Sequence, residues 1–178
     1  TVQHTIAEPT IAELGRRGTP FVGLLYCGLI VTTAGIRVIE FNARFGDPET
    51  QVVLPRLRGD FGDLLLQAAT GHLYSTPEFS TDCAITVVLA SEGYPEAPLT
   101  GRPITGLAEA AAIPGTKLLH AATAREQDAL VTTGGRVLDV VATAATFPLA
   151  RSAAYAALAR IHLDGAQHRT DIGSKVSK

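Results

Sequence analysis

The chain has 178 residues, of which 46% are hydrophobic and 18% are charged, and 15 basic residues against 17 acidic ones give a formal net charge of −2. This apolar content is too high for a disordered chain, and the length suffices for a buried core in one or two domains. The near-neutral charge argues against a protein that binds nucleic acid through its phosphates. A membrane span is not expected either, because the sequence lacks a run of about 18 apolar residues.

Two cysteines, Cys27 and Cys83, lie in apolar stretches and form no Cys-x-x-Cys motif. We therefore expect buried free thiols and a reducing, cytoplasmic location, rather than a disulfide framework or a zinc site. The sequence starts at Thr1 and contains no Met, so we expect it to be the C-terminal piece of a longer protein.

The first 75 residues predict helices around a pair of strands. Residues 1–17 read as a short helix interrupted at Pro9, and residues 21–32 and 37–41 read as the strands of a hairpin. Asp47 has the position of an N-cap for a helix over residues 48–57, in which Glu49 supplies a favourable first-turn charge. A further helix is expected from Asp60 to Thr70, with Gly71 ending it.

The composition changes at residues 72–80, where Ser, Thr, Pro and Tyr replace the apolar periodicity, and we place a domain boundary there. Beyond it, four stretches read as strands: 84–90, 117–122, 129–133 and 136–144. Gly134-Gly135 predicts a tight hairpin between the last two. An Ala-rich helix should follow over residues 148–163, burying Ala154, Leu158 and Ile161. Strands followed by helices, without strict alternation, indicate an α+β fold.

The densest group of polar side chains lies in residues 38–49. On an extended strand, alternate residues share a face, so Glu40, Asn42 and Arg44 would line one side. The other side would be buried, through Ile39, Phe41, Ala43 and Phe45. A carboxylate and an amide carbonyl two residues apart suit a hard cation such as Mg²⁺, and Arg44 would suit a phosphate or carboxylate. The alternative is an amphipathic strand whose polar face is merely solvated.

Other chemistries have little support in the sequence. P-loop, GxGxxG, HExxH and GxSxG motifs are missing, and the five histidines are dispersed. His120 and His162 are expected to be structural or surface residues. Asp139, in the strand over residues 136–144, is expected to point to water rather than to a substrate.

Residues 40–51 read EFNARFGDPETQ, which resembles the signature of the phosphoribosylamine–glycine ligases, a family of ATP-grasp enzymes also called glycinamide ribonucleotide synthetases. Further resemblances follow in the family's order: LYCGL at 25–29, GYP at 93–95, GGRVL at 134–138 and RTDIG at 169–173. The resemblance therefore extends along essentially the whole chain.

The resemblance implies that residues 1–75 are the C-terminal half of an ATP-grasp domain and residues 76–178 a small sheet-and-helix C-terminal domain. It also implies a cytoplasmic reaction of purine biosynthesis. ATP phosphorylates the glycine carboxylate, and the amine of 5-phosphoribosylamine attacks the acyl phosphate to give glycinamide ribonucleotide, ADP and phosphate. Such a reaction depends on positioning and on charge neutralisation by a metal and Arg residues.

Carried over by motif position, Glu40 and Asn42 resemble the family's ligands for Mg²⁺ or Mn²⁺. Arg44 resembles a catalytic charge clamp on a phosphate. The resemblance also implies four substrate-side residues: Asp47, Glu49, Arg169 and Asp171. Neither a nucleic acid nor a membrane is an expected partner.

Departures from the family pattern limit these implications. Residues 120–124 read HAATA, which replaces a usual Gly and Lys by Ala122 and Ala124, and Cys27 stands where a small Ala is usual. The first half of ATP-grasp, with its glycine-rich loop and its lysines, is expected to be missing. We therefore expect the isolated chain to be inactive without that half, its expected partner. The alternatives are another ATP-grasp carboxylate–amine ligase, or a non-catalytic interaction module derived from such an enzyme.

Overall fold

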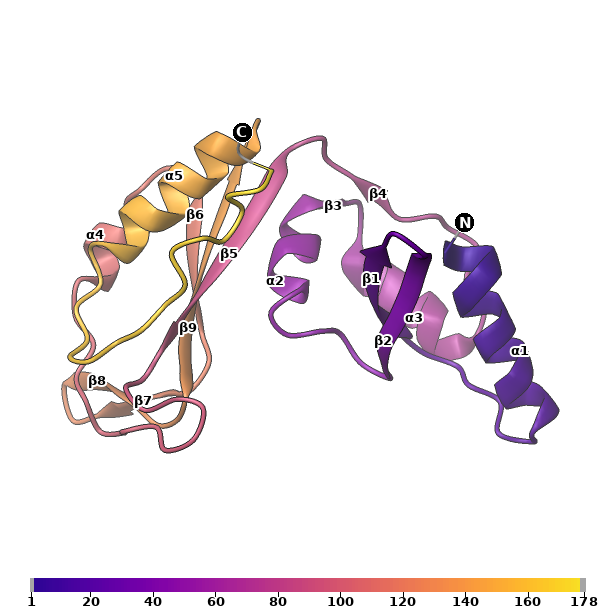
Figure 1. Ribbon diagram of the computed structural model, residues 1–178, viewed down its shortest axis with the longest axis horizontal. Coiled ribbons are helices and arrows are strands. Elements are labelled where there is room, and N and C mark those ends of the chain that lie inside the picture. The colour runs from indigo at the N-terminus through magenta and orange to yellow at the C-terminus, as the bar shows by residue number, and fades with distance from the viewer. Residues whose placement is uncertain (1, 177–178) are drawn as a thin grey trace. The chain divides into compact units, whose positions relative to one another are not determined.

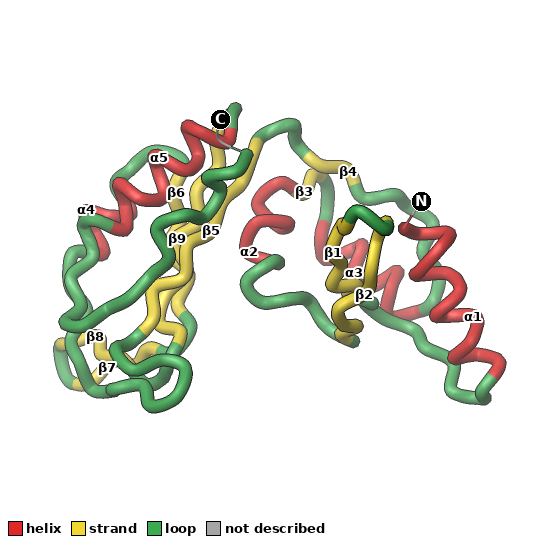
Figure 2. Tube along the Cα trace, in the orientation of Figure 1, coloured by secondary structure: helices red, strands yellow, loops and turns green. Residues whose placement is uncertain are grey.

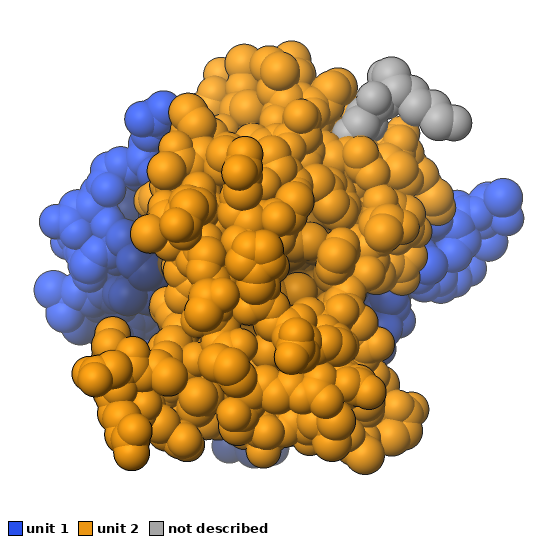
Figure 3. Space-filling model, turned by 90° about the vertical axis from the view of Figure 1, so that its left-hand side faces the viewer, with its two compact units in different colours: residues 1–50, 57–79 blue, residues 51–56, 80–178 orange. Residues whose placement is uncertain are grey.

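The computed structural model describes residues 2–176 and divides the chain into two compact units. Unit 1 contains residues 1–50 and 57–79, and unit 2 contains residues 51–56 and 80–178 (Figures 1 and 3). The short segment 51–56 therefore belongs to unit 2, although it precedes the second part of unit 1 in sequence. Within the described range, no helix combines the length and apolar character needed to cross a bilayer.

Unit 1 begins with a helix that changes type along its length. A π-helix, η1 (Gln3–Ala7), continues directly into α1 (Glu8–Arg16). Pro9 lies in the first turn of α1, directly after the π-helical residues, and the chain stays helical through it. The predicted interruption at Pro9 is therefore wrong, while the predicted helix is confirmed over its described residues; Thr1 lies outside them.

The hairpin of unit 1 carries the polar segment identified in the sequence. Strand β1 (Tyr26–Thr32) pairs antiparallel with β2 (Gly35–Asn42), which confirms the predicted hairpin, although residues 21–25 of the expected first strand lie outside β1. Where the register shifts, Gly28 pairs with Glu40 but Leu29 pairs with Val38, so β2 has one extra residue there.

Between the hairpin and residue 79 the chain forms short elements and one longer helix (Figure 2). The short ones are α2 (Thr50–Val53), the 3₁₀ turn η2 (Leu54–Arg56), β3 (Leu57–Arg58) and β4 (Glu78–Phe79), of which α2 and η2 lie wholly or largely in unit 2. The longer helix is α3 (Phe61–Thr70). Asp60 accepts a hydrogen bond from the backbone of Asp63 at its start, and Gly71 ends it with a φ of 72°, which confirms the predicted caps.

Unit 2 contains a three-stranded antiparallel sheet with the order β5-β9-β6. Its strands are β5 (Cys83–Ala90), β6 (Thr116–His120) and β9 (Arg136–Ala144). Helix α5 (Phe147–Leu158) packs on this sheet, and α4 (Leu107–Ala111) lies beside β6 (Figure 1). A second, two-stranded sheet joins β7 (Thr123–Glu126) to β8 (Ala129–Thr132).

Two predictions in unit 2 are wrong in an instructive way. Gly134-Gly135 does not form a hairpin, because β8 pairs with β7 while β9 pairs with β5 and β6. Helix α5 ends at Leu158 rather than near residue 163, although Ala154 and Leu158 are buried and Ile161 packs against the core from beyond the helix end.

Cys27 and Cys83 are free, as expected, but both are half-buried rather than buried.

Candidate functional site

Glu40 and Asn42 lie on one face of β2 and contact each other. The Asn42 Nδ2 donates a hydrogen bond of 2.9 Å to Glu40 Oε1, so the shared face that strand alternation predicts is present. Gly28, opposite Glu40 on β1, makes room for this side chain, because a Cβ at Gly28 would stand 3.0 Å from Glu40 Cγ. Glu40 is exposed and Asn42 half-buried.

The strand does not continue to Arg44. Strand β2 ends at Asn42, and residues 43 and 44 form a bend, where Arg44 donates 2.9 Å to the carbonyl of Phe45. Strand alternation therefore does not extend to Arg44, and the placement of Arg44 beside Glu40 and Asn42 stays a prediction.

The predicted burial of the opposite face is also wrong. Ile39 is 67% exposed and Phe41 43% exposed, and Ala43 is exposed as well. Phe45 is half-buried, with its ring 5.7 Å from that of Phe61. The sequence pattern correctly marks an apolar face, but in this structure much of that face is uncovered.

Asp47 and Glu49 lie in a turn and not in a helix. The turn covers residues 47–49, and Thr50 donates both its backbone NH and its hydroxyl to the carbonyl of Gly46. Helix α2 starts only at Thr50, so the expectation that Asp47 is its N-cap and Glu49 a first-turn charge is wrong. The turn instead directs the Glu49 side chain back toward the hairpin. Both Glu49 and Tyr26 lie close to Gly46, because a Cβ added at Gly46 would stand 2.5 Å from Glu49 Oε2 and 3.1 Å from Tyr26 Cε2.

Three charged residues of the signature act on Tyr26. Its pKa is raised, first by burial, then by the charge of Glu49 and a hydrogen bond to it, and further by the charge of Glu40, while Arg44 acts in the opposite direction. The sequence reasoning did not identify Tyr26. The hairpin register was the available signal, because Tyr26 pairs directly with Asn42.

This arrangement fits a divalent cation by its donor chemistry. The Asn42 amide uses its nitrogen toward Glu40, which leaves an amide oxygen and a carboxylate as hard oxygen donors side by side. Mg²⁺ commonly takes one or two protein ligands and completes its shell with water and phosphate oxygens. Residues 2–176 contain no cluster of three or more His, Cys, Asp or Glu side chains that could hold a metal. A cation at Glu40 and Asn42 would therefore need water or phosphate oxygens to complete its shell.

Arg169 and Asp171 form their own pair in unit 2. Two hydrogen bonds join the guanidinium to the carboxylate, from Nε to Oδ1 at 2.8 Å and from Nη2 to Oδ2 at 2.6 Å, and both side chains are exposed. Their hydrogen bonding raises the pKa of Arg169 and lowers the pKa of Asp171. The backbone next to the pair is held by Tyr155, whose hydroxyl donates 2.7 Å to the Arg169 carbonyl.

Asp139 contradicts its expected exposure. It lies in the middle of β9, is only 4% exposed, and accepts a hydrogen bond of 3.0 Å from Gln51 Nε2. Gln51 is 88 residues earlier in the chain, so a sequence pattern around Asp139 carries no signal for this contact.

Comparisons with known proteins identify both parts of the chain. Residues 84–175 match the family model described as phosphoribosylglycinamide synthetase, C domain, and residues 1–50 match the model of the ATP-grasp (A) domain of the same enzyme. The fold is thus mixed α+β: part of an ATP-grasp A domain, followed by the C domain.

Curated relatives and a solved structure agree with these models. The phosphoribosylamine–glycine ligase of Leifsonia xyli subsp. xyli is 62% identical over 98% of this chain, and that of Streptomyces coelicolor 56% identical over 99%. The chain spans 43% of the length of each of these relatives. The crystal structure of the Thermotoga maritima phosphoribosylamine–glycine ligase superposes with a TM-score of 0.76 at 33% identity, covering 89% of this chain and 39% of that one.

Proposed function

The chain belongs to the phosphoribosylglycinamide synthetase family, and on that premise we propose that it is part of an ATP-dependent ligase of purine biosynthesis. The reaction would join glycine to 5-phosphoribosylamine. The γ-phosphoryl of ATP passes to the glycine carboxylate, the amine then attacks the acyl carbon, and phosphate leaves to give glycinamide ribonucleotide. The observation that carries this proposal is the contact between Glu40 and Asn42 within the signature.

The proposed roles follow from what each side chain offers. Glu40 and Asn42 present two oxygen donors to Mg²⁺ or Mn²⁺, which when bound would neutralise phosphate charge. Arg44, exposed just beyond the strand, would hold a phosphate oxygen through its guanidinium. The turn carrying Asp47 and Glu49 would border the substrate pocket, with Tyr26 orienting Glu49 by hydrogen bonding.

Arg169 and Asp171 are proposed to shape the substrate side. Their mutual hydrogen bonds hold both side chains in one orientation, which reduces the rotamer entropy that a substrate contact would have to overcome. These two bonds use two of the five N–H donors of the Arg169 guanidinium, and the other three are proposed to bind an anionic substrate.

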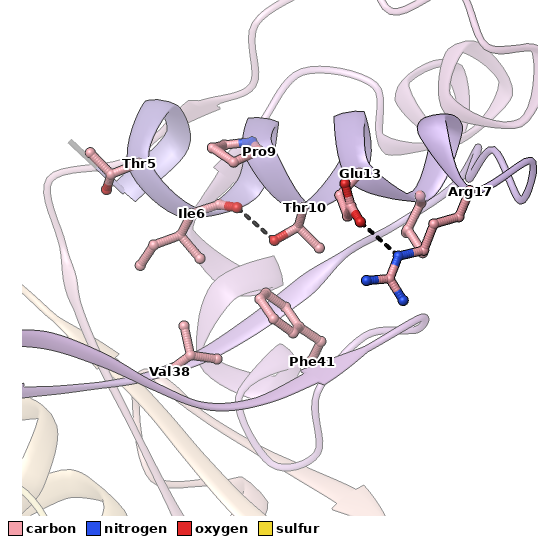
Figure 4. Close-up of a pocket in the computed structure, with 9 residues that line it drawn as sticks. Thr5, Ile6, Pro9, Thr10, Glu13, Arg17, Val38 and Phe41 are labelled. Atoms are coloured by element: carbon pink, nitrogen blue, oxygen red, sulfur yellow. Dashed lines mark hydrogen bonds and ion pairs between the residues drawn. The ribbon is translucent and has the colours of Figure 1, made fainter.

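We further propose that unit 1 packs against the polypeptide that corresponds to the remainder of the relatives' length. The supporting observation is a groove of about 470 Å³ between the first helix and β2. Figure 4 shows Ile6 and Pro9 on one side of it and Val38 and Phe41 on the other. Apolar walls of this kind fit apolar side chains of a partner segment rather than a charged ligand. The 178-residue chain alone is therefore expected to lack ligase activity.

A chimeric enzyme tests the function directly. In the Leifsonia xyli ligase, this chain would replace the region that it matches, and ADP formation dependent on both glycine and 5-phosphoribosylamine would be measured. The chimera should be active, and Glu40→Gln should lower kcat/KM by at least about a hundredfold, because the metal loses a charged ligand. Glu126→Gln is the matched control, since it removes an exposed carboxylate of β7 in unit 2.

Two outcomes would contradict the proposal. Full activity of the Glu40→Gln chimera, across a Mg²⁺ titration, would remove the metal role of the signature. A folded chimera without any glycine-dependent ADP formation would favour the non-catalytic module, while turnover with a different carboxylate would favour another ATP-grasp ligase.

A further inference from the structure

A buried carboxylate in the central strand of unit 2 needs a reason to be there. Asp139 is 4% exposed and lies between Leu138 and Val140, both fully buried. Its sheet neighbours are Val88 on β5 and Leu119 on β6. Moving a carboxylate from water into such surroundings is costly unless hydrogen bonds compensate it, and an apolar residue would serve packing alone at least as well.

One hydrogen bond that Asp139 accepts comes from a distant segment. Gln51 donates to Asp139 Oδ2 over 3.0 Å, and it is the last residue of the EFNARFGDPETQ signature. Gln51 is also the first residue of the segment 51–56, which belongs to unit 2. The bond joins an amide N–H to a buried carboxyl oxygen, a group that costs free energy if it is left without a partner.

The other end of the same segment is anchored too. Arg56 Nη2 donates 3.0 Å to the carbonyl of Ser80, and the Ser80 backbone NH donates 2.7 Å to the carbonyl of Arg56. Segment 51–56 is thus fixed to unit 2 at both ends, through Asp139 at its start and Ser80 at its finish. The turn with Asp47 and Glu49 ends two residues before the first anchor.

We propose that Asp139 is a positioning residue: by holding Gln51, it fixes the C-terminal end of the signature turn that presents Asp47 and Glu49. This inference rests on the proposed function for its meaning in catalysis. The order of residues 46–56 would depend on the Asp139 side chain whether or not the protein is a ligase. The role of Asp139 is indirect, because it acts through Gln51.

Hydrogen exchange on the 178-residue chain, without nucleotide or substrate, tests the physical content. Amide exchange of residues 46–56 would be followed by mass spectrometry in wild type and Asp139→Leu. We expect exchange in this segment to rise about tenfold or more, because the hydrogen bond from Gln51 to a buried acceptor is lost. Exchange in β5 and β6 should change little, since Leu fills the strand position with an apolar side chain of similar size.

Three further variants make the result specific. Val140→Ala is the matched control: it creates a cavity one residue away, so it should raise exchange across the sheet of unit 2 without singling out residues 46–56. Asp139→Asn keeps an acceptor oxygen and should stay closer to wild type than Asp139→Leu. Gln51→Leu should reproduce Asp139→Leu, and the double variant should add little to either.

Several results would overturn the inference. These are unchanged exchange of residues 46–56 in Asp139→Leu, an equal rise throughout unit 2, or a wild-type segment that already exchanges at the unprotected rate. None of these readouts requires ligase activity. An inactive chimera would therefore refute the proposed function and leave this inference standing. Conversely, an active chimera together with an equal rise in exchange throughout unit 2 of Asp139→Leu would support the function and refute this inference.

Discussion

Unit 2 buries its apolar side chains, and unit 1 does not. In unit 2 the core contains thirteen buried residues around β5, β9 and α5, among them Val137, Leu138 and Val140 at 0% exposure. Among the described residues of unit 1, only Gly28, Gly46 and Gln67 are buried. Unit 1 instead exposes large apolar side chains on its hairpin and its helix α3, including Ile30, Val31, Ile39, Leu65 and Leu66.

This difference separates what holds each unit together. Unit 2 gains its stability from area removed from water, at roughly 25 cal/mol per Å² of apolar surface. Unit 1 relies on local devices: the capped helix α3, the hairpin ladder, and Gln67, whose Oε1 accepts hydrogen bonds from the backbone of Tyr74 and Ser75. Such local bonds contribute little net free energy each, so unit 1 draws less stability from its own burial than unit 2 does.

The largest expected effect is a cavity in the core of unit 2. Leu138→Ala should lower the free energy of unfolding by about 2–5 kcal/mol, because the side chain is fully buried. Leu66→Ala, on the exposed side of α3 in unit 1, should change it by less than about 0.5 kcal/mol. Urea denaturation followed by circular dichroism measures both. Similar losses for the two variants would erase the contrast between the units.

Glycine substitution should give the next largest effect. Gly106 has a φ of 78°, and a Cβ there would collide with the carbonyl oxygen of Arg160, so Gly106→Ala should cost about 3 kcal/mol or more. Gly101 has a similar φ of 77° but open space around it, so Gly101→Ala should cost only the backbone penalty of about 1–2 kcal/mol. Thermal unfolding compares them. Equal melting temperatures would show that packing around Gly106 yields without cost.

Within unit 1, a smaller and purely electrostatic effect is expected at Tyr26. Glu49→Gln should move the Tyr26 pKa back toward its ordinary value, because the variant removes the nearby negative charge while burial remains. Since the folded-state pKa is raised, the stabilising contribution of neutral Tyr26 is complete below the ordinary pKa and is lost as the pH rises through the raised value. Ultraviolet titration of tyrosinate measures the shift, with Tyr26→Phe identifying the signal. An unmoved titration would place Glu49 away from the hydroxyl.

The smallest expected effect concerns the surface of α1. Arg16, and then Arg17, hydrogen-bond Glu13 and lower its pKa. Because the folded-state pKa is lowered, this contribution is present above the ordinary carboxyl pKa and disappears as the pH falls through the lowered value. Glu13→Gln should therefore reduce helicity slightly at neutral pH and low salt, and not in acid. A helicity difference that persists in acid, measured by circular dichroism at 222 nm, would contradict the ion-pair origin.

Local signals in the sequence were enough for much of the fold. The caps of α3, Asp60 and Gly71, are chemical features of single residues, and the β1–β2 hairpin connects neighbouring segments. The shared face of Glu40 and Asn42 follows from strand period alone. Each of these features depends on residues close in sequence, so a local sequence pattern is enough to predict it.

The errors share the opposite property. Which strands β9 joins, and so whether Gly134-Gly135 makes a hairpin, depends on pairing with residues far away in sequence. The hydrogen bond to Asp139 comes from Gln51, 88 residues earlier, and the exposure of Ile39 is a tertiary property that strand alternation does not encode. Alternation shows which side of a strand is apolar, but a covering surface must come from elsewhere in the polypeptide.

The placement of residues 51–56 has a practical consequence for dissecting the chain. The C-domain match starts at residue 84, so a clone beginning at Ser80 would look like a natural way to excise that domain. Such a clone would omit Arg56, which bonds Ser80 through its backbone and side chain, and would deprive Asp139 of its Gln51 donor. An autonomous piece would have to start upstream of Gln51, and so would carry part of the other unit along with it.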